Sequence, residues 1–94
     1  MYRDLDPILH SQLRLAVVSI LVTVEKADFA YLKNETGATS GNLSVQITKL
    51  KDAGYIEVNK KFKGNYPQTS CRITDLGKER FAGYVQAISG YLKP

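Results

Sequence analysis

The chain has few of the residues from which metal sites and disulfides are built. Its 94 residues contain one cysteine, Cys71, one histidine, His10, and no tryptophan. A single cysteine excludes an internal disulfide and any multi-cysteine zinc site formed by this chain alone. We therefore expect neither a resident metal nor a cofactor. Because Cys71 falls in a segment rich in β-formers, we expect its thiol to be buried and inert rather than a redox sensor.

Long hydrophobic runs are also lacking. The longest apolar stretch, residues 15–24, is about half of the roughly 20 residues that a membrane-spanning helix needs, and Ser19 and Thr23 interrupt it. The N-terminal sequence MYRDLDP contains acidic residues and lacks the hydrophobic core of a secretory signal. Together with the single cysteine, these absences predict a cytoplasmic protein that does not enter a membrane.

Signatures of catalysis are missing as well. The sequence contains no HExxH, GxSxG, Walker or CxxC motif, and His10 lies near an apolar segment without a paired cysteine. Ser11 and Ser19 are better explained as a helix cap and a helix filler than as nucleophiles. Asp4 and Asp6 are more simply a solvated acidic start than a catalytic carboxylate pair. We therefore expect that the protein is not an enzyme.

The length of the chain limits its organisation. Ninety-four residues have room for one domain of modest core, residues 1–94, and no space for a separate sensing or catalytic domain. No internal repeat or low-complexity segment is visible. We expect a single folding unit.

Positive charge is present in excess, and it is concentrated in one segment. The formal net charge is +4, and residues 40–72 hold six basic residues against two acidic ones, while the remainder carries seven of each sign. A concentrated basic segment favours a polyanion such as duplex DNA, because each neutralised phosphate releases condensed counterions. The alternative is an ordinary solvated lysine face.

Two short helices are predicted within residues 28–54. Asp28 can cap a helix that begins at the next residue, and Gly37 can end it by adopting a left-handed backbone angle. Thr39 or Ser40 can then cap a second helix, which runs up to Gly54. Two helices joined by a tight turn are typical of DNA-reading domains.

The second of these helices has an apolar and a polar face. Leu43, Ile47 and Leu50 recur at helical spacing, so we expect them to point inward. The residues that we expect to face outward together are Asn42, Ser44, Val45, Thr48 and Lys49. Small polar groups on an exposed helix suit the reading of base edges in a DNA groove. The alternative is an amphipathic helix whose polar face only contacts water.

A β-hairpin is predicted directly after the second helix. Residues 55–62 are rich in β-formers and residues 69–74 can pair with them, whereas the intervening KGNYPQ carries turn-forming residues. The tip of this hairpin is basic. A helix-turn-helix followed by a two-stranded hairpin is the winged-helix arrangement, in which the second helix enters the major groove and the hairpin lies along the neighbouring backbone.

A further helix is predicted near the N-terminus. Most positions of residues 11–25 are apolar, so we expect a helix that is covered on more than one side, by the domain or by a second subunit. Its β-branched residues also suit a buried strand, but the length exceeds that of a typical strand. Asp6 before Pro7 is one candidate for the helix start, and Ser11 is the other.

The last helix is predicted to begin at Thr74. Its apolar stripe consists of Phe81, Val85, Ile88 and Leu92, with Tyr84 and Tyr91 beside it. In a domain this small, so wide an apolar face predicts burial against a partner subunit. Packing within the chain alone is the alternative.

Three segments carry a resemblance to a known family. They are LDPILHSQLRLAVVSIL at residues 5–21, ADFAYLKNETGATSGNLSVQITKLKDAGYIEV at residues 27–58, and RITDLGKERF at residues 72–81. With these segments the chain resembles, over nearly its whole length, the small winged-helix transcriptional regulators related to the MarR and ArsR groups. The resemblance implies a mainly α fold, with a three-helix bundle, a two-stranded wing and a C-terminal helix. It also implies a homodimer joined through the N-terminal and C-terminal helices that reads a pseudo-palindromic operator in double-stranded DNA.

The resemblance also implies which residues contact DNA. On the second helix of the helix-turn-helix these are Asn42, Ser44, Val45, Thr48 and Lys49, with Thr39 and Ser40 at the helix start. On the wing they are Lys61, Lys63, Asn65 and Tyr66. Lys49, Lys61 and Lys63 are expected to hold phosphates, and the smaller side chains of the helix are expected to contact bases.

The chain departs from the family's pattern at three of these positions. Many relatives have arginine in place of Val45 and basic residues in place of Asn65 and Tyr66. Arginine grips guanine through two hydrogen bonds, whereas valine offers only apolar contact, for example with a thymine methyl group. We therefore expect an A·T-rich operator or a low affinity. The alternative function is a winged helix that binds protein through its exposed helix or its apolar terminal helix.

Overall fold

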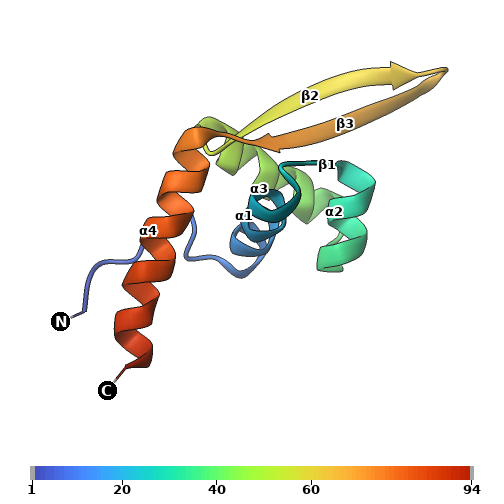
Figure 1. Cartoon of the computed structure of the whole chain (residues 1–94). Coiled ribbons are helices and arrows are strands. Elements are labelled where there is room, and N and C mark those ends of the chain that lie inside the picture. Colours follow the sequence, from blue (N-terminus) through green and yellow to red (C-terminus); the bar gives the residue numbers. More distant parts are fainter. Residues whose placement is uncertain (1, 94) are drawn as a thin grey trace.

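A computed structural model describes residues 2–93, which form four helices and a three-stranded antiparallel sheet (Figure 1). The elements in chain order are α1 (Gln12–Val24), β1 (Lys26–Asp28), α2 (Phe29–Thr36), α3 (Ser40–Asp52), β2 (Ile56–Lys63), β3 (Tyr66–Ile73) and α4 (Asp75–Leu92). The predicted order of a helix-turn-helix followed by a hairpin and a last helix is confirmed. The mainly α composition is confirmed with it.

Side-chain caps fix the starts of three helices, as predicted. The Asp28 carboxylate accepts from the backbone N–H of Tyr31 at 2.7 Å, and Thr74 accepts from Gly77 at 3.0 Å. The α3 cap is Thr39, whose hydroxyl accepts from the backbone N–H of the third residue along at 3.2 Å, so Ser40 is the first helical residue. Each such bond satisfies a backbone donor that the helix leaves unpaired.

The start of α1 lies later than the first of its two candidates. Asp6 does accept from the backbone N–H of Ile8 at 2.8 Å, but this bond closes only an isolated turn. Ser11 then adopts an extended conformation, with φ −152° and ψ 129°, and α1 begins at Gln12. The helix start predicted at Asp6 and Pro7 is therefore wrong, and Ser11 is the N-cap.

A third strand, β1, was missing from the prediction of a two-stranded wing. Glu25 ends α1 with a positive φ of 67°, and the next three residues then pair with β3 in the register Lys26↔Arg72 and Ala27↔Cys71. The sheet order is β1-β3-β2. Three residues without a β-former give no strand signal in sequence, because the pairing depends on the approach of β3.

The second strand of the hairpin is longer than predicted, and the first has the predicted length but is shifted by one residue. Lys63 pairs with Tyr66, so the turn contains only Gly64 and Asn65, and Gly64 has φ 65° as such two-residue turns require. Pro67, which cannot donate a hydrogen bond, lies beyond the part of β3 that β1 covers. Proline is tolerated at such an edge. Tyr66 consequently belongs to the strand.

The core lies where the helices meet the base of the sheet. From α3, the predicted inward residues Leu43, Ile47 and Leu50 are all buried. The buried residues of α1 are Val17, Val18 and Leu21, and most others in this helix are half-buried, as expected for a helix covered on more than one side. The residues of the hairpin beyond its base are exposed and contribute nothing to the core.

The inner face of α4 differs from the predicted stripe. The buried residues are Gly77, Tyr84 and Ala87, whereas Val85 is 43% exposed and Leu92 is 75% exposed. Small residues at the contact let the helix approach its neighbours closely, because a Cβ on residue 77 would lie 2.2 Å from the Tyr55 carbonyl oxygen. The predicted apolar stripe therefore lies to one side of the intramolecular contact and remains half exposed.

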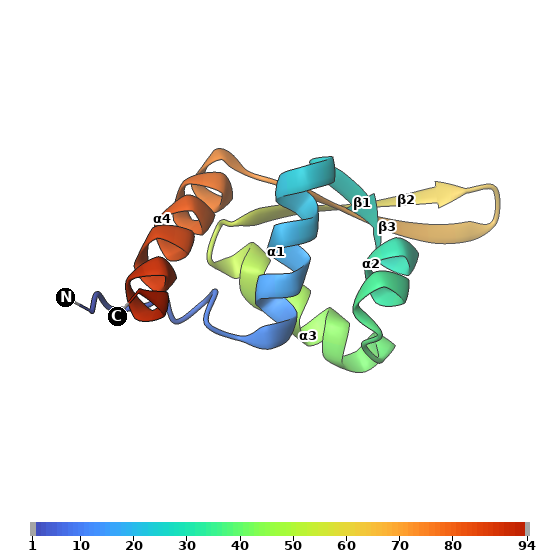
Figure 2. The same cartoon turned by 60° about the horizontal axis from the view of Figure 1, so that its bottom comes forward.

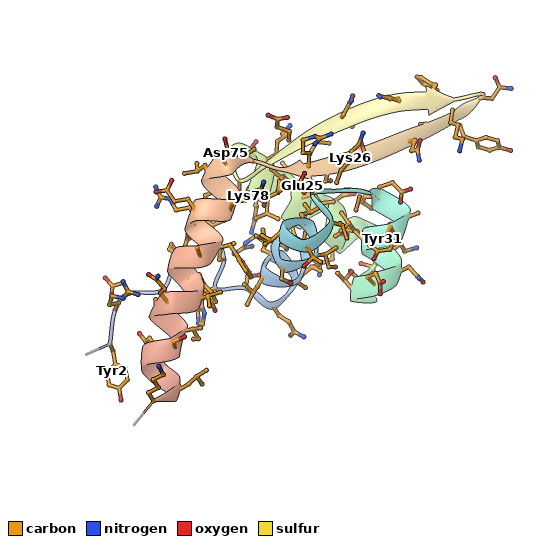
Figure 3. All side chains as sticks on the ribbon, viewed as in Figure 1. Tyr2, Glu25, Lys26, Tyr31, Asp75 and Lys78 are labelled. Carbon is orange, nitrogen blue, oxygen red and sulfur yellow. The ribbon has the colours of Figure 1, made fainter. Side chains whose placement is uncertain are left out.

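The described chain is elongated, with extents of 54 × 25 × 21 Å. In Figures 1 and 2 the β2–β3 hairpin projects from one side and α4 lies at the other, with α1, α2 and α3 between them. Figure 3 shows Lys78 at the start of α4 beside Glu25, and their ion pair measures 3.3 Å. Both side chains are well exposed, so this pair adds little stability.

Candidate nucleic-acid interface

All of the predicted DNA-facing residues of α3 are exposed. They are Thr39, Ser40, Asn42, Ser44, Val45, Thr48 and Lys49. Successive residues of a helix are rotated by about 100°, so these side chains spread over a wide arc rather than a single line. Val45, which is 51% exposed, lies opposite the buried stripe, with Ser44 on one flank and Asn42 on the other.

The flank with Ser44 and Thr48 borders a groove between α3 and the sheet. This groove has a volume of about 310 Å³ and is lined by Phe29, Ser44, Ile47, Thr48, Lys51, Val58, Lys60 and Thr69. Two lysines therefore converge on it, one from the last turn of α3 and one from β2. Hydroxyl groups beside ammonium groups can hydrogen-bond a base edge while the charges hold nearby phosphates.

Thr48 contributes an acceptor to this groove. Its hydroxyl donates to the backbone carbonyl of Ser44 at 3.0 Å, which uses the only proton that the group has. The remaining lone pairs can only accept a hydrogen bond. In the major groove the matching donors are the amino groups of adenine and cytosine.

The two faces of the hairpin carry different predicted residues. Side chains alternate along a strand, and Val58 and Lys60 line the groove on the side of α3. Lys61 and Lys63 therefore point to the opposite face, where Lys61 is paired with Gln68 and Lys63 with Tyr66. Asn65 lies in the turn. The structure thus does not bring these wing residues together with Ser44 and Thr48.

Lys60 and Lys51 were missed by the sequence reasoning. A signal for Lys60 was available, because the apolar Val58 two residues earlier sets which face of β2 turns inward. Lys51 follows Leu50, which is buried, and lies one helical turn after Ile47 and Thr48. Its position on the groove depends on where the sheet packs, and the helix pattern alone does not give that.

Two buried side chains of the core, Cys71 and Tyr55, have raised pKa values. Burial raises the pKa of the Cys71 thiol to about 11, and the side chain has no exposed area. Burial, and then the hydrogen bond that its hydroxyl donates to Asp6, raise the pKa of Tyr55 to about 12. The prediction of a buried Cys71 is confirmed.

Neither a metal cluster nor a membrane helix is found in the described residues. No group of three or more His, Cys, Asp or Glu side chains between residues 2 and 93 is placed to hold a metal ion. None of the helices in that range combines the length and apolar character that a membrane crossing demands.

Comparison with known proteins places this geometry in a family. The family description of a winged helix DNA-binding domain matches residues 13–92. The chain belongs to this family. The winged-helix fold predicted from the sequence is thereby confirmed, with β1 as an addition to its two-stranded wing. Membership supports a DNA-binding regulator, in which α3 has the position of the DNA-reading helix.

Two proteins share about 30% sequence identity with this winged helix DNA-binding domain. An uncharacterised protein of Methanocaldococcus jannaschii is 31% identical over 81 residues, which cover 86% of this chain and 88% of the relative. The solved structure of a transcriptional regulator homologue from Pyrococcus horikoshii is 30% identical, with a TM-score of 0.78, and covers 93% of this chain and 89% of that one.

A third comparison concerns the fold alone. The structure of a putative transcriptional regulator from Thermoplasma acidophilum is 21% identical and has a TM-score of 0.76. The match covers 94% of this chain and 90% of that chain. The winged helix DNA-binding domain described here is therefore nearly coextensive with solved chains named as regulators.

Proposed function

We propose that this winged helix is a cytoplasmic transcriptional regulator of the MarR and ArsR type that binds a pseudo-palindromic DNA operator as a homodimer and has no catalytic activity. The observation that carries this proposal is the exposed face of α3 beside the basic groove. Ser44 and Thr48 face that groove together with Lys51 and Lys60. Polar groups that contact bases, flanked by cations that hold phosphates, are what duplex recognition requires.

The proposed roles of the α3 residues follow from their positions. Asn42, Ser44 and Thr48 contact base edges, and Lys49 holds a phosphate. At the start of α3, Thr39 occupies only one of the free backbone N–H groups, so those of Ser40 and Gly41 face solvent and suit a phosphate oxygen. Val45 offers a thymine methyl group an apolar contact, which favours A·T-rich sites.

The wing has a backbone-holding role in this proposal. Lys61 and Lys63 contact phosphates, and Asn65 and Tyr66 approach the backbone at the tip. All four are exposed, and the hairpin extends well beyond the core, so it can follow the duplex away from α3 (Figure 1). We extend the same role to Lys60, on the opposite face of β2.

The proposed dimer uses the terminal helices. Phe81, Val85, Ile88 and Leu92 form a half-exposed apolar stripe on α4, as described above. The N-terminal segment lies against the end of the same helix, where the Tyr91 hydroxyl donates to the Arg3 carbonyl at 2.7 Å. Burial of this stripe by a second copy removes apolar surface from water.

The decisive experiment is selection of bound duplexes from a random pool. We expect a two-fold symmetric motif whose half-sites lie about one helical turn apart, because dimer symmetry is copied into the operator. Affinity is expected to fall steeply with added salt. Enrichment of no motif, with weak and salt-insensitive binding, contradicts the proposal.

A second candidate is a protein-binding winged helix. The observation that favours it is the exposure of two aromatic side chains on the wing, Phe62 and Tyr66, each 78% exposed. Exposed aromatic residues are typical of protein interfaces. A stable protein complex together with salt-insensitive DNA association supports this candidate instead.

A further inference from the structure

Asn42 belongs to a chain of hydrogen bonds that begins in α1. The Arg14 guanidinium donates through Nη1 to Oε1 of Gln46, and Nε2 of Gln46 donates to Oδ1 of Asn42 at 3.0 Å. Gln46 is half-buried between the exposed face of α3 and the start of α1. Figure 2 shows α1 crossing α3, and these two helices are in contact.

Arg14 itself is firmly held. Its Nε donates to the carbonyl of Ile8 at 2.6 Å, and its Nη2 lies 3.4 Å from the carbonyl of Pro7. The side chain is half-buried, so it has little freedom to turn. The turn before α1, which Asp6 closes, therefore fixes the guanidinium that faces Gln46.

The donor and acceptor order of this chain follows from its first member. A guanidinium has only donors, so the atom of Gln46 that faces Arg14 must be the carbonyl oxygen. The amide nitrogen of Gln46 then faces Asn42, and it requires the carbonyl oxygen of Asn42 as its acceptor. Consequently the Asn42 NH₂ group is the part of that exposed amide that remains free to point at a ligand.

We propose that Arg14 and Gln46 are positioning residues that fix Asn42 as a hydrogen-bond donor toward DNA and thereby set its base preference. This inference rests on the proposed function. A donor suits O6 and N7 of guanine, O4 of thymine and N7 of adenine, whereas cytosine presents only an amino donor. An adenine contact through both amide groups of Asn42 is disfavoured, because its oxygen is turned toward Gln46.

The decisive variant is Gln46→Glu. A carboxylate has acceptors only, so it keeps the bond from Arg14 and then accepts from the amide nitrogen of Asn42. The Asn42 amide must rotate, and its oxygen becomes the exposed group. At one base position of each half-site, the preference is expected to move from guanine or thymine to cytosine by about tenfold or more, whereas adenine can pair with the amide in either orientation.

The matched control is Gln12→Glu. Gln12 lines the same shallow pocket as Asn42 and Gln46, so the same substitution adds the same charge nearby. Among the described residues, Gln12 makes no hydrogen bond to the side chains of Arg14, Gln46 or Asn42. Q12E is expected to weaken binding to all sequences evenly and to leave the selected motif unchanged.

A second readout needs no DNA. In NMR spectra of the free protein, the side-chain amide protons of Gln46 are expected to be hydrogen-bonded in the parent, and those of Asn42 are expected to be hydrogen-bonded in Q46E. Unchanged Asn42 amide shifts in that variant overturn the proposal. Arg14→Met removes the anchor, so we expect both amides to become free and the base preference to broaden.

The failures of the two proposals are distinguishable. A parent chain that binds no duplex overturns the proposed function and the DNA role of Asn42 with it. A parent chain that selects a motif, which Q46E then selects without change, overturns only the role of Asn42. A shift of preference in Q46E but not in Q12E supports the proposal.

Discussion

Tyr55 joins the end of α3 to the N-terminal segment through a single side-chain hydrogen bond, which its hydroxyl donates to Asp6. Its pKa is raised to about 12 by burial and by Asp6, so the neutral phenol is the form that stabilises the fold. This contribution is fully present below the ordinary pKa of 10 and is lost as pH rises toward 12. Tyr55→Phe is expected to lower the free energy of unfolding by about 1 to 2 kcal/mol at pH 7.

Urea unfolding of both proteins between pH 7 and 11 measures this effect. The difference between parent and variant is expected to be constant up to about pH 10 and to shrink above it. A Tyr55→Phe protein of unchanged stability at neutral pH contradicts the role assigned to the hydrogen bond.

Burial lowers the reactivity of the Cys71 thiol. With a pKa of about 11, about a thousandth of the thiol is ionised at pH 8, and the side chain has no exposed area. A thiol reagent is therefore expected to modify the native protein far more slowly than the protein in denaturant, when both are followed by absorbance. Rapid stoichiometric reaction of the native chain would contradict the predicted inert thiol.

The two hydroxyl residues of the groove should act on specificity more than on overall affinity. Ser44→Ala or Thr48→Ala is expected to change which site is preferred, at a cost of roughly 1 to 3 kcal/mol if a base contact is lost. Competition between variants of the selected duplex measures the change. Equal weakening on every duplex indicates that these hydroxyls do not read bases.

At the scale of elements, the packing of α4 depends on Gly77. A Cβ there would lie 2.2 Å from the Tyr55 carbonyl oxygen and 2.8 Å from Cδ1 of Ile73, and the first of these atoms belongs to rigid backbone. Gly77→Ala is expected to destabilise the fold by more than about 2 kcal/mol. Gly83 of the same helix has no atom within 4 Å of its Cβ position, so Gly83→Ala is expected to stabilise by up to about 1 kcal/mol. Thermal unfolding of the two variants should therefore shift in opposite directions.

The two faces of the wing can be compared by mutating the lysines of each face separately. Lys61→Ala and Lys63→Ala are each expected to weaken binding evenly across sequences and to flatten its dependence on salt by about one unit of slope. Lys60→Ala, on the face toward α3, is expected to do the same. Salt slopes equal to that of the parent for Lys61→Ala and Lys63→Ala, with a changed slope for Lys60→Ala, would mean that only the inner face contacts DNA.

The elements that sequence predicted well are those set by local chemistry. Asp28 was identified as a cap residue, Thr39 as one of two candidates and Thr74 as the start of the last helix, because such side chains satisfy the first free backbone donors of a helix. The inward residues of α3 followed from spacing alone, and so did the exposure of Val45. Local signals therefore gave the helix-turn-helix and the hairpin almost completely.

The parts that sequence missed depend on long-range contacts. β1 forms only because β3 passes beside it, and the inner face of α4 is chosen by small residues rather than by its largest apolar stripe. The groove at α3 depends on where the sheet packs against the helix, and this packing brings Lys51 to its edge. Each of these features is a relation between two elements, and a pattern within one element does not contain it.

At the scale of the whole molecule, the proposed DNA-binding surface and the apolar stripe of α4 are separate. The hairpin and α3 lie away from the free end of α4, which is near the N-terminal segment (Figure 1). The Tyr2 and Tyr91 rings, whose centroids are 5.0 Å apart, hold that segment against the helix. A dimer formed there leaves both copies of α3 free, so dimerisation and DNA binding can be tested independently.

Val85→Glu is the variant that tests the dimer. The side chain is 43% exposed in the single chain, so a carboxylate is tolerated by the monomer but is costly once a second copy buries it. We expect sedimentation of the parent as a dimer and of Val85→Glu as a monomer, with unchanged thermal unfolding at low protein concentration. Gln86→Glu, one position along and also exposed, is the control and should remain dimeric.

On duplexes with two half-sites the monomeric variant should lose affinity, whereas on a single half-site it should bind like the parent, because the surface of α3 is intact. A parent that sediments as a monomer at all concentrations contradicts the proposed homodimer and leaves single half-site recognition as the mode of binding.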